Sequence, residues 1–154
     1  MSSTNGADSR ATAVTAQLVV FSLGEEEYAL PITDVQEIIR YTEPRAVASA
    51  APWIRGVISL RGKIIPVCDL AARLALPADG ARRANIVIVE TESGTGGVIV
   101  DAVQEVLTVD EGQLDALPTA GADVIEAIAR IGDRLVVLLD PNGIFAGVEA
   151  AAAA

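Results

Sequence analysis

Residues 54–67 read IRGVISLRGKIIPV, and this stretch decides the fold. Two apolar arms rich in β-branched residues flank the turn formers Arg61-Gly62-Lys63, a pattern that predicts a β-hairpin. Three further pairs of apolar segments are separated by turn residues in the same way: 17–23 with 28–32, 86–89 with 98–100, and 124–131 with 134–139. Strand signals therefore dominate, although the arm 124–131 also fits a helical period.

The two halves of the chain echo each other. Residues 35–38, VQEI, recur at 103–106 as VQEV, an offset of 68, and residues 63–69 parallel residues 134–140 at an offset of 71. Two unconnected matches at nearly one offset predict the duplication of a unit of about 70 residues. Chance agreement between short apolar strings is the alternative.

Short helical segments are predicted at a few corners. Asp69 is a suitable N-cap for a helix over residues 70–76, and a second helical piece is expected near residues 110–117. Each copy of the repeated string is also predicted to open one helical turn with a capping box. The residues that would form these boxes are Thr33 with Gln36 and Asp101 with Gln104.

A unit of this size, with four or five short strands, would leave edges and one apolar face unpaired in an open sheet. Closing each unit into a small barrel removes the edges, so we predict two small all-β barrels at about 16–84 and 85–146. The seam between them is the natural place for a shared apolar core or a groove. Residues 1–15 and the alanine-rich residues 147–154 lack apolar periodicity and are expected to be disordered.

The composition excludes several classes of function. The 154 residues contain no histidine and one cysteine, Cys68, which excludes the usual zinc sites and the Ser-His-Asp and Cys-His nucleophilic sites. Residues 1–84 hold nine basic and nine acidic side chains, whereas residues 85–154 hold two basic and twelve acidic ones, so the second half carries the whole net charge of −10. Nucleic acid is therefore excluded as a partner. No apolar run approaches 18 residues and no targeting segment is recognisable, so a cytoplasmic protein without membrane insertion is expected.

Two further features have a bland and a functional interpretation. The glycine-rich stretch 92–97 lacks the lysine and hydroxyl of a phosphate-binding loop, which favours a hairpin turn. The carboxylate pairs Asp34/Glu37 and Asp101/Glu105 lack the spacing of a calcium loop, which favours solvated or capping roles. A carboxylate-based enzyme or a small-ligand-binding barrel stays open as the alternative, and it requires a pocket between the barrels with converging polar groups.

The basic turn in the deciding hairpin favours a docking surface. Arg61 lies beside a glycine in an otherwise acidic protein and is surrounded in sequence by apolar residues, with Arg55 six residues earlier. A guanidinium in such a setting is well suited to pairing with a carboxylate across an interface. Trp53, the only tryptophan, is expected in the core, with an interface anchor as the alternative.

These residues resemble the family of CheW chemotaxis coupling proteins. The resemblance runs in order along residues 17–146. It is carried by four strings: residues 21–38 (FxLGxxxYALPIxxVxEI), 52–70 (PxIxGVIxLRGKIIPVxDL), 98–106 (VIVDxVxEV) and 138–140 (LLD). One departure is Ser59, where the family usually has asparagine.

The resemblance implies two SH3-like five-stranded β-barrel subdomains and no enzymatic activity, cofactor or metal. It implies an adaptor that couples transmembrane chemoreceptors to the histidine kinase CheA, whose regulatory domain has the same fold, so that like modules can join in rings. Carried over by motif, Val35, Glu37, Arg55 and Arg61 are the expected contacts with the cytoplasmic receptor tips. Flagellar chemotaxis and another chemosensory output are both open.

Overall fold

The computed structural model describes residues 15–48, 51–76, 82–116 and 123–146. The expected disorder of both ends concerns residues outside this part of the chain, except Thr15, which begins the first strand. The elements in chain order are β1 (Thr15–Leu23), β2 (Glu26–Pro31), η1 (Ile32–Asp34), β3 (Val35–Arg40), β4 (Ile54–Leu60), β5 (Lys63–Asp69), α2 (Leu70–Arg73), β6 (Asn85–Thr91), β7 (Gly94–Val100), β8 (Ala102–Asp110), η2 (Glu111–Gln113), β9 (Leu114–Ala116), β10 (Ile125–Ile131), β11 (Arg134–Leu139) and α3 (Pro141–Ile144).

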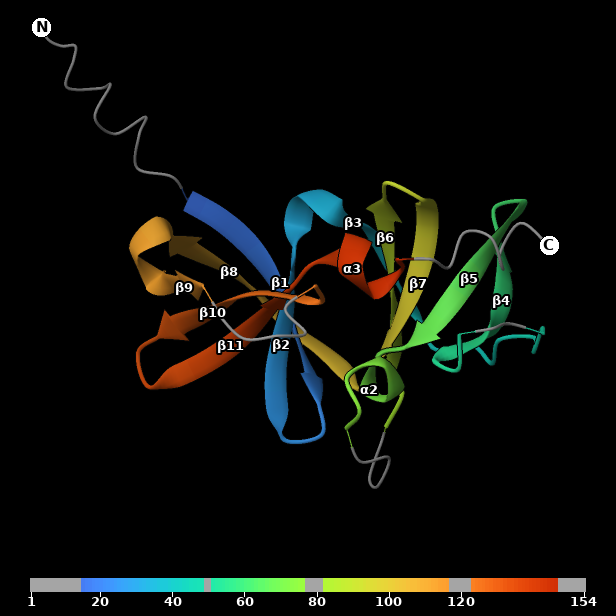
Figure 1. The fold of residues 1–154 in the computed structure, drawn as a ribbon, viewed down its shortest axis with the longest axis horizontal. Helices are drawn as coiled ribbons and strands as arrows, with labels where there is room; N and C mark the ends of the chain where they lie inside the picture. Colours follow the sequence, from blue (N-terminus) through green and yellow to red (C-terminus); the bar gives the residue numbers. More distant parts are fainter. Residues whose placement is uncertain (1–14, 49–50, 77–81, 117–122, 147–154) are drawn as a thin grey trace, which may run out of the picture.

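The strands form two sheets, as the predicted mainly β fold requires. Sheet A has the order β8-β1-β2-β11-β10-β9, and sheet B has the order β3-β6-β7-β5-β4. Sheet A lies on the left of Figure 1 and sheet B on the right, with α2 and α3 between them. All four predicted hairpins are present as antiparallel pairs, β1–β2, β4–β5, β6–β7 and β10–β11. The ambiguous arm 124–131 is therefore a strand, β10.

The two sheets repeat one arrangement of five strands. Reading along each sheet, β8, β1, β2, β11 and β10 occupy the places that β3, β6, β7, β5 and β4 occupy in the other. Each sheet contains one parallel contact at the same place, β2 with β11 and β7 with β5. The repeated strings lie on the equivalent strands β3 and β8 and on β5 and β11, as a duplication predicts.

The division expected near residues 84 and 85 does not coincide with the division between the sheets. Strands β6 and β7 complete sheet B, and the N-terminal hairpin β1–β2 lies at the centre of sheet A with β8–β11. The chain thus begins in sheet A, builds the whole of sheet B, and returns to sheet A. Local strand signals could not show that the hairpins β1–β2 and β6–β7 each join strands from the other half of the chain, because the pairing partner of a hairpin lies far away in sequence.

The structure corrects three local expectations, the first entirely and the other two in the length of the helical segment. The predicted capping boxes at Thr33 and Asp101 are wrong, because the repeated strings are strands β3 and β8 whose backbones pair with β6 and β1. A capping box does form between Asp110 and Gln113, but it opens a single turn, η2, that leads into strand β9. The cap at Asp69 is confirmed, since its side chain accepts a hydrogen bond from the Ala72 backbone N–H, although the helix ends at Arg73.

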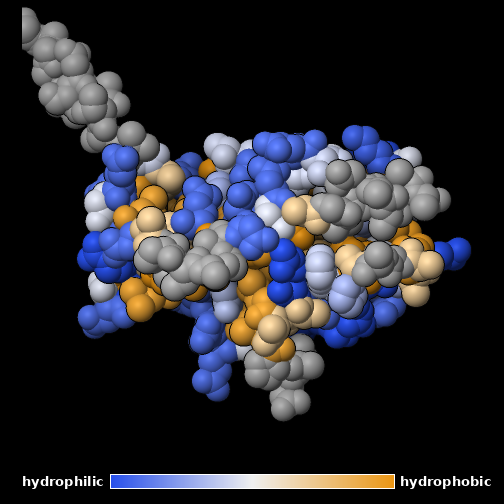
Figure 2. All heavy atoms as spheres, in the orientation of Figure 1, coloured by the Kyte–Doolittle hydropathy of each residue, from blue (hydrophilic) through white to orange (hydrophobic). Residues whose placement is uncertain are grey.

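Three apolar cores hold the molecule together. One lies within sheet A, one within sheet B, and the largest lies between the sheets, where the seam was predicted to hold a shared core. The shared core takes residues from both sheets and from α2 and α3, including Phe21, Tyr28, Leu70, Val98 and Ile144. Burying such side chains contributes about 1.5–3 kcal/mol each, so the two subdomains stabilise each other. In the space-filling view, hydrophilic side chains of the β1–β2 turn project at the lower edge (Figure 2).

Candidate functional site

Arg61 lies at the tip of the β4–β5 hairpin in an unusual backbone conformation. Leu60 pairs with Lys63, so Arg61 and Gly62 form a two-residue turn, with φ of +53° and +81°. Positive φ at both positions is the geometry of a type I′ turn, which favours asparagine or glycine. An arginine here is held in the left-handed region, with its side chain 66% exposed.

Glu37, on β3, meets this arginine. An Nη atom of Arg61 lies 2.9 Å from the Glu37 carboxylate, although the two residues come from opposite ends of the strand order of sheet B. The curvature of the sheet therefore brings the hairpin tip over β3. Two neighbours in sequence, Ile38 and Ile64, are apolar yet 41% and 65% exposed. The pair is thus an exposed charged contact at the hairpin tip, and the same sheet carries two unburied isoleucines on β3 and β5.

Val35 plays a different part from Glu37. A β-bulge lies between these two residues in the pairing of β3 with β6. Val35 is half-buried and packs against the shared core, whereas Glu37 turns to the hairpin tip. Val35 therefore fixes the start of β3 relative to the seam and leaves only part of its surface for a partner.

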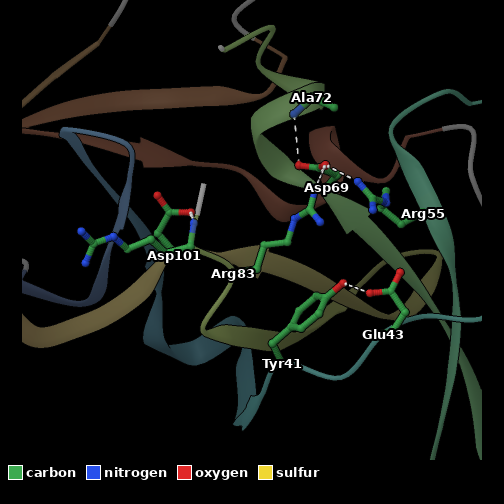
Figure 3. Close-up of polar contacts among 8 residues, drawn as sticks. Tyr41, Glu43, Arg55, Asp69, Ala72, Arg83 and Asp101 are labelled. Atoms are coloured by element: carbon green, nitrogen blue, oxygen red, sulfur yellow. Dashed lines mark hydrogen bonds and ion pairs between the residues drawn. The ribbon is translucent and has the colours of Figure 1, made fainter. Parts of the chain in front are cut away.

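Arg55 is separated from the other basic candidate. It is the second residue of β4 and Arg61 follows the end of that strand, so an extended strand holds the two Cα atoms about 20 Å apart. An Nη atom of Arg55 lies 3.1 Å from the Asp69 carboxylate, and Arg83 lies 3.8 Å from the same oxygen (Figure 3). Sequence reasoning missed both partners, although Asp69 ends the second arm of the predicted hairpin and lies close to the level of Arg55, whereas Arg83 shares no local pattern with either. Asp69 also caps α2, so it holds this cluster to the helix.

Tyr41 and Glu43 lie beside the Arg55 cluster (Figure 3). The Tyr41 hydroxyl donates a hydrogen bond of 2.8 Å to the Glu43 carboxylate. Burial and this hydrogen bond raise the pKa of Tyr41, while the positive charges of Arg83 and Arg55 act to lower it. The structure therefore divides the four candidate residues between a Glu37–Arg61 pair and an Arg55–Asp69–Arg83 cluster, with Val35 at the shared core.

Trp53 belongs to the seam. It is half-buried and packs against the shared core, as expected, and the Arg73 guanidinium lies 4.6 Å from the centre of its ring. Arg73 also donates a hydrogen bond to the backbone oxygen of Gly143 in α3. The hydrogen bond ties α2 to α3 across the seam, and the cation–π contact ties α2 to the segment before β4.

The remaining candidate groups have structural positions. The glycine-rich stretch 92–97 forms the turn of the β6–β7 hairpin and the first part of β7. Burial raises the pKa of the Cys68 thiol, so it remains protonated. Within the described residues, no group of three or more acidic, cysteine or histidine side chains is placed to hold a metal ion. In the same part of the chain, no helix has the length and apolar character needed to cross a membrane.

A family model described as the CheW-like domain matches residues 17–149. The chain belongs to the CheW-like family. It is 33% identical over 142 residues to a probable chemotaxis protein CheW of Rhizobium etli, covering 89% of this chain and 92% of that protein. It is 35% identical over 133 residues to the chemotaxis protein CheW of Bacillus subtilis, covering 83% and 85% of the two chains.

A solved CheW structure has the same fold. The crystal structure of the scaffolding protein TtCheW from Thermoanaerobacter tengcongensis matches with a TM-score of 0.79 at 35% identity, covering 86% of this chain and 94% of that one. The expected fold of two β subdomains and the expected family are confirmed. The CheW-like chain is a non-enzymatic chemotaxis adaptor, so the alternative of a carboxylate-based enzyme is set aside.

Proposed function

We propose that this CheW-like chain couples chemoreceptors to the histidine kinase CheA by presenting Arg61 to a carboxylate on the receptor tip. The observation that carries the proposal is the exposed Glu37–Arg61 pair at the hairpin tip of sheet B, which also carries the exposed side chains of Ile38 and Ile64. An exposed ion pair contributes only about 0–1 kcal/mol, so a partner carboxylate can share or replace Glu37 at little cost. Burial of the two isoleucines would add apolar contact area.

Arg55 contributes to the same proposal from a second position. Its side chain is one-third exposed, so part of it stays open to a partner while the guanidinium pairs with Asp69. Because Arg55 and Arg61 lie at opposite ends of β4, a receptor segment that contacts both must run along this strand. Val35 would meet the receptor only through the part of its surface that the shared core leaves uncovered.

Membership of the CheW-like family supports a proposal about the finer partners. We propose the regulatory domain of CheA as the kinase contact, and assembly with other CheW-like modules into rings. The protein would then work on the cytoplasmic side of the membrane and be recruited to receptor arrays. The acidic strands β8–β11 of sheet A support a separate partner for that sheet, because their charge differs from that of the hairpin tip.

The test is a kinase-coupling assay with purified CheA and receptor-containing membranes. Arg61→Glu places two carboxylates together at the hairpin tip, so receptor-stimulated kinase activity should fall at least about tenfold. Lys63→Glu is the matched control, since it makes the same charge change two residues away and should stay within about threefold of the wild type. Both variants should keep the wild-type circular dichroism spectrum. Unchanged coupling in folded Arg61→Glu would refute the role of Arg61.

Salt provides a second readout of the same contact. Partly exposed Arg–carboxylate contacts are screened by ions, so receptor binding by the wild type should weaken as ionic strength rises. The Arg61→Glu variant should respond less steeply to salt. A wild-type affinity that is flat between low and physiological salt would count against the charged contact.

A further inference from the structure

Sheet A carries an open groove that the proposed receptor contact does not use. Its volume is about 560 Å³, and it is lined by the β1–β2 turn, the start of β8 and parts of β10 and β11. Apolar lining comes from Ile128, Leu135 and Val137. Leu135 is 61% exposed, one of the most exposed large apolar side chains in the described residues. Apolar side chains that gather in an exposed groove, as these three do, mark interaction sites, whereas single exposed ones do not.

The groove is strongly acidic. Three consecutive glutamates, residues 25–27, line it beside a single cation, Arg134. Two guanidinium nitrogens of Arg134 each lie 3.0 Å from a Glu27 oxygen, and one of them is 2.7 Å from Glu105. The hydrogen bonds to Glu27 and Glu105 raise the pKa of Arg134, so it stays charged. One positive charge thus stands against the four carboxylates of Glu25, Glu26, Glu27 and Glu105, which leaves an excess of negative charge.

The equivalent place on sheet B is less acidic, because the three glutamates of residues 25–27 correspond at the offset of 68 to the uncharged residues Ser93, Gly94 and Thr95. Leu135 corresponds to Ile64 at the repeat offset of 71, and Ile64 is also exposed, at 65%. The residues next to Ile64 at that hairpin tip include Lys63 and Arg61. Duplication has therefore kept an exposed apolar residue on both sheets, while the charges around it have diverged. The more acidic surface on sheet A favours a partner with more positive charge.

We propose that the groove on sheet A binds an extended basic segment of a partner protein, with an apolar side chain of that segment packed on Leu135. Lysine or arginine residues on either side of this side chain would lie near Glu25 and Glu26. The excess negative charge repels nucleic acid and acidic protein segments. The proposal is independent of the receptor contact at Arg61, because the groove lies on the other sheet.

The test uses the full chain labelled with ¹⁵N and a blocked heptapeptide, Lys-Leu-Lys-Val-Lys-Leu-Lys. Titration should shift backbone amide resonances of the β1–β2 turn and of β11, and the peptide should bind more weakly as salt rises. The double substitution Glu25→Gln with Glu26→Gln should weaken binding at least about threefold, and so should Leu135→Ser. Glu92→Gln, on the equivalent β6–β7 turn, is the control and should stay within about twofold.

Three outcomes would overturn the proposal. One is equal binding of the matched acidic peptide, Glu-Leu-Glu-Val-Glu-Leu-Glu. Another is binding elsewhere on the chain, seen either as the absence of shifts at the groove or as binding that neither set of groove substitutions weakens. The third comes from sedimentation: if the wild type self-associates and the glutamate double variant does not, a second copy of this chain fills the groove instead of a separate partner.

Discussion

At the scale of single residues, Arg61 is kept where its backbone is costly. The left-handed conformation costs a non-glycine residue about 1 kcal/mol, and the exposed pair with Glu37 returns at most a similar amount. Stability alone therefore gives no preference for arginine over asparagine or glycine at this turn. The arginine is better explained by what its guanidinium contacts than by folding.

Tyr28 gives a pH-dependent prediction. Burial, followed by the hydrogen bond to Glu26 and the charge of that carboxylate, raises the pKa of Tyr28 from 10.0 to about 12. The folded chain therefore keeps the phenol proton between about pH 10 and 12, where the unfolded chain loses it, so the free energy of unfolding should fall as pH rises through this window. Absorbance titration of the phenols measures this pKa in the folded chain.

Substitution isolates the signal from Tyr28. Tyr28→Phe should remove the ionisation near pH 12, while Tyr41→Phe should leave it in place. Loss of both phenol protons near pH 10 in protein that is still folded by circular dichroism would contradict the prediction.

At the scale of elements, the exposed edge of β4 is covered by a neighbouring segment. Arg45 and Val57 exchange two backbone hydrogen bonds, of 2.8 and 2.9 Å. The close approach is possible because residue 56 is a glycine with φ of +153°, and a Cβ there would overlap the Arg45 carbonyl. This contact closes a strand edge that would otherwise be free to pair with another chain.

Replacing Gly56 should therefore be severe. Gly56→Ala should lower the free energy of unfolding by at least about 2 kcal/mol, because both the backbone conformation and the contact with Arg45 must change. Gly24→Ala is the control: its φ is +63° and a Cβ there meets nothing within 4 Å, so the cost should be about 1 kcal/mol. Urea denaturation measures both. Equal losses would show that the Arg45 contact has no importance for stability.

At the scale of the whole molecule, the sheets are interleaved along the chain. The N-terminal hairpin β1–β2 supplies central strands of sheet A, while β6 and β7 supply those of sheet B. Leu18 and Val20 lie in the core of sheet A, whereas Phe21 and Leu23 lie in the shared core. A single strand, β1, therefore contributes to two cores, which couples the folding of the subdomains.

Fragments provide the corresponding test. Residues 1–84 would lack β6 and β7, and residues 85–154 would lack β1 and β2, so each fragment would miss central strands of one sheet. Neither fragment should show cooperative thermal unfolding, whereas the full chain should unfold in one transition. A cooperative transition in either fragment alone would contradict the interleaved arrangement as the unit of stability.

The sequence by itself determined the local structure and the family. Alternating apolar residues and turn formers fix a hairpin within about 15 residues, so all four hairpins, the Asp69 cap and the internal repeat could be predicted. The motif strings identified the CheW-like family. Local signals failed at the repeated string itself, where a short polar pattern suited a helix cap while long-range pairing with β6 and β1 imposed a strand.

Only the tertiary structure decided which hairpin joins which sheet and which charges meet. The partner of a hairpin is set by burial of apolar faces contributed by residues far apart in sequence, so the exchange of β1–β2 and β6–β7 left no local signal. The tertiary structure also decided the ion pairs: Arg55 is held by Asp69, and Arg61 is held by Glu37. The family motif named these arginines as candidates, but the curvature of sheet B determined that Arg61 meets Glu37.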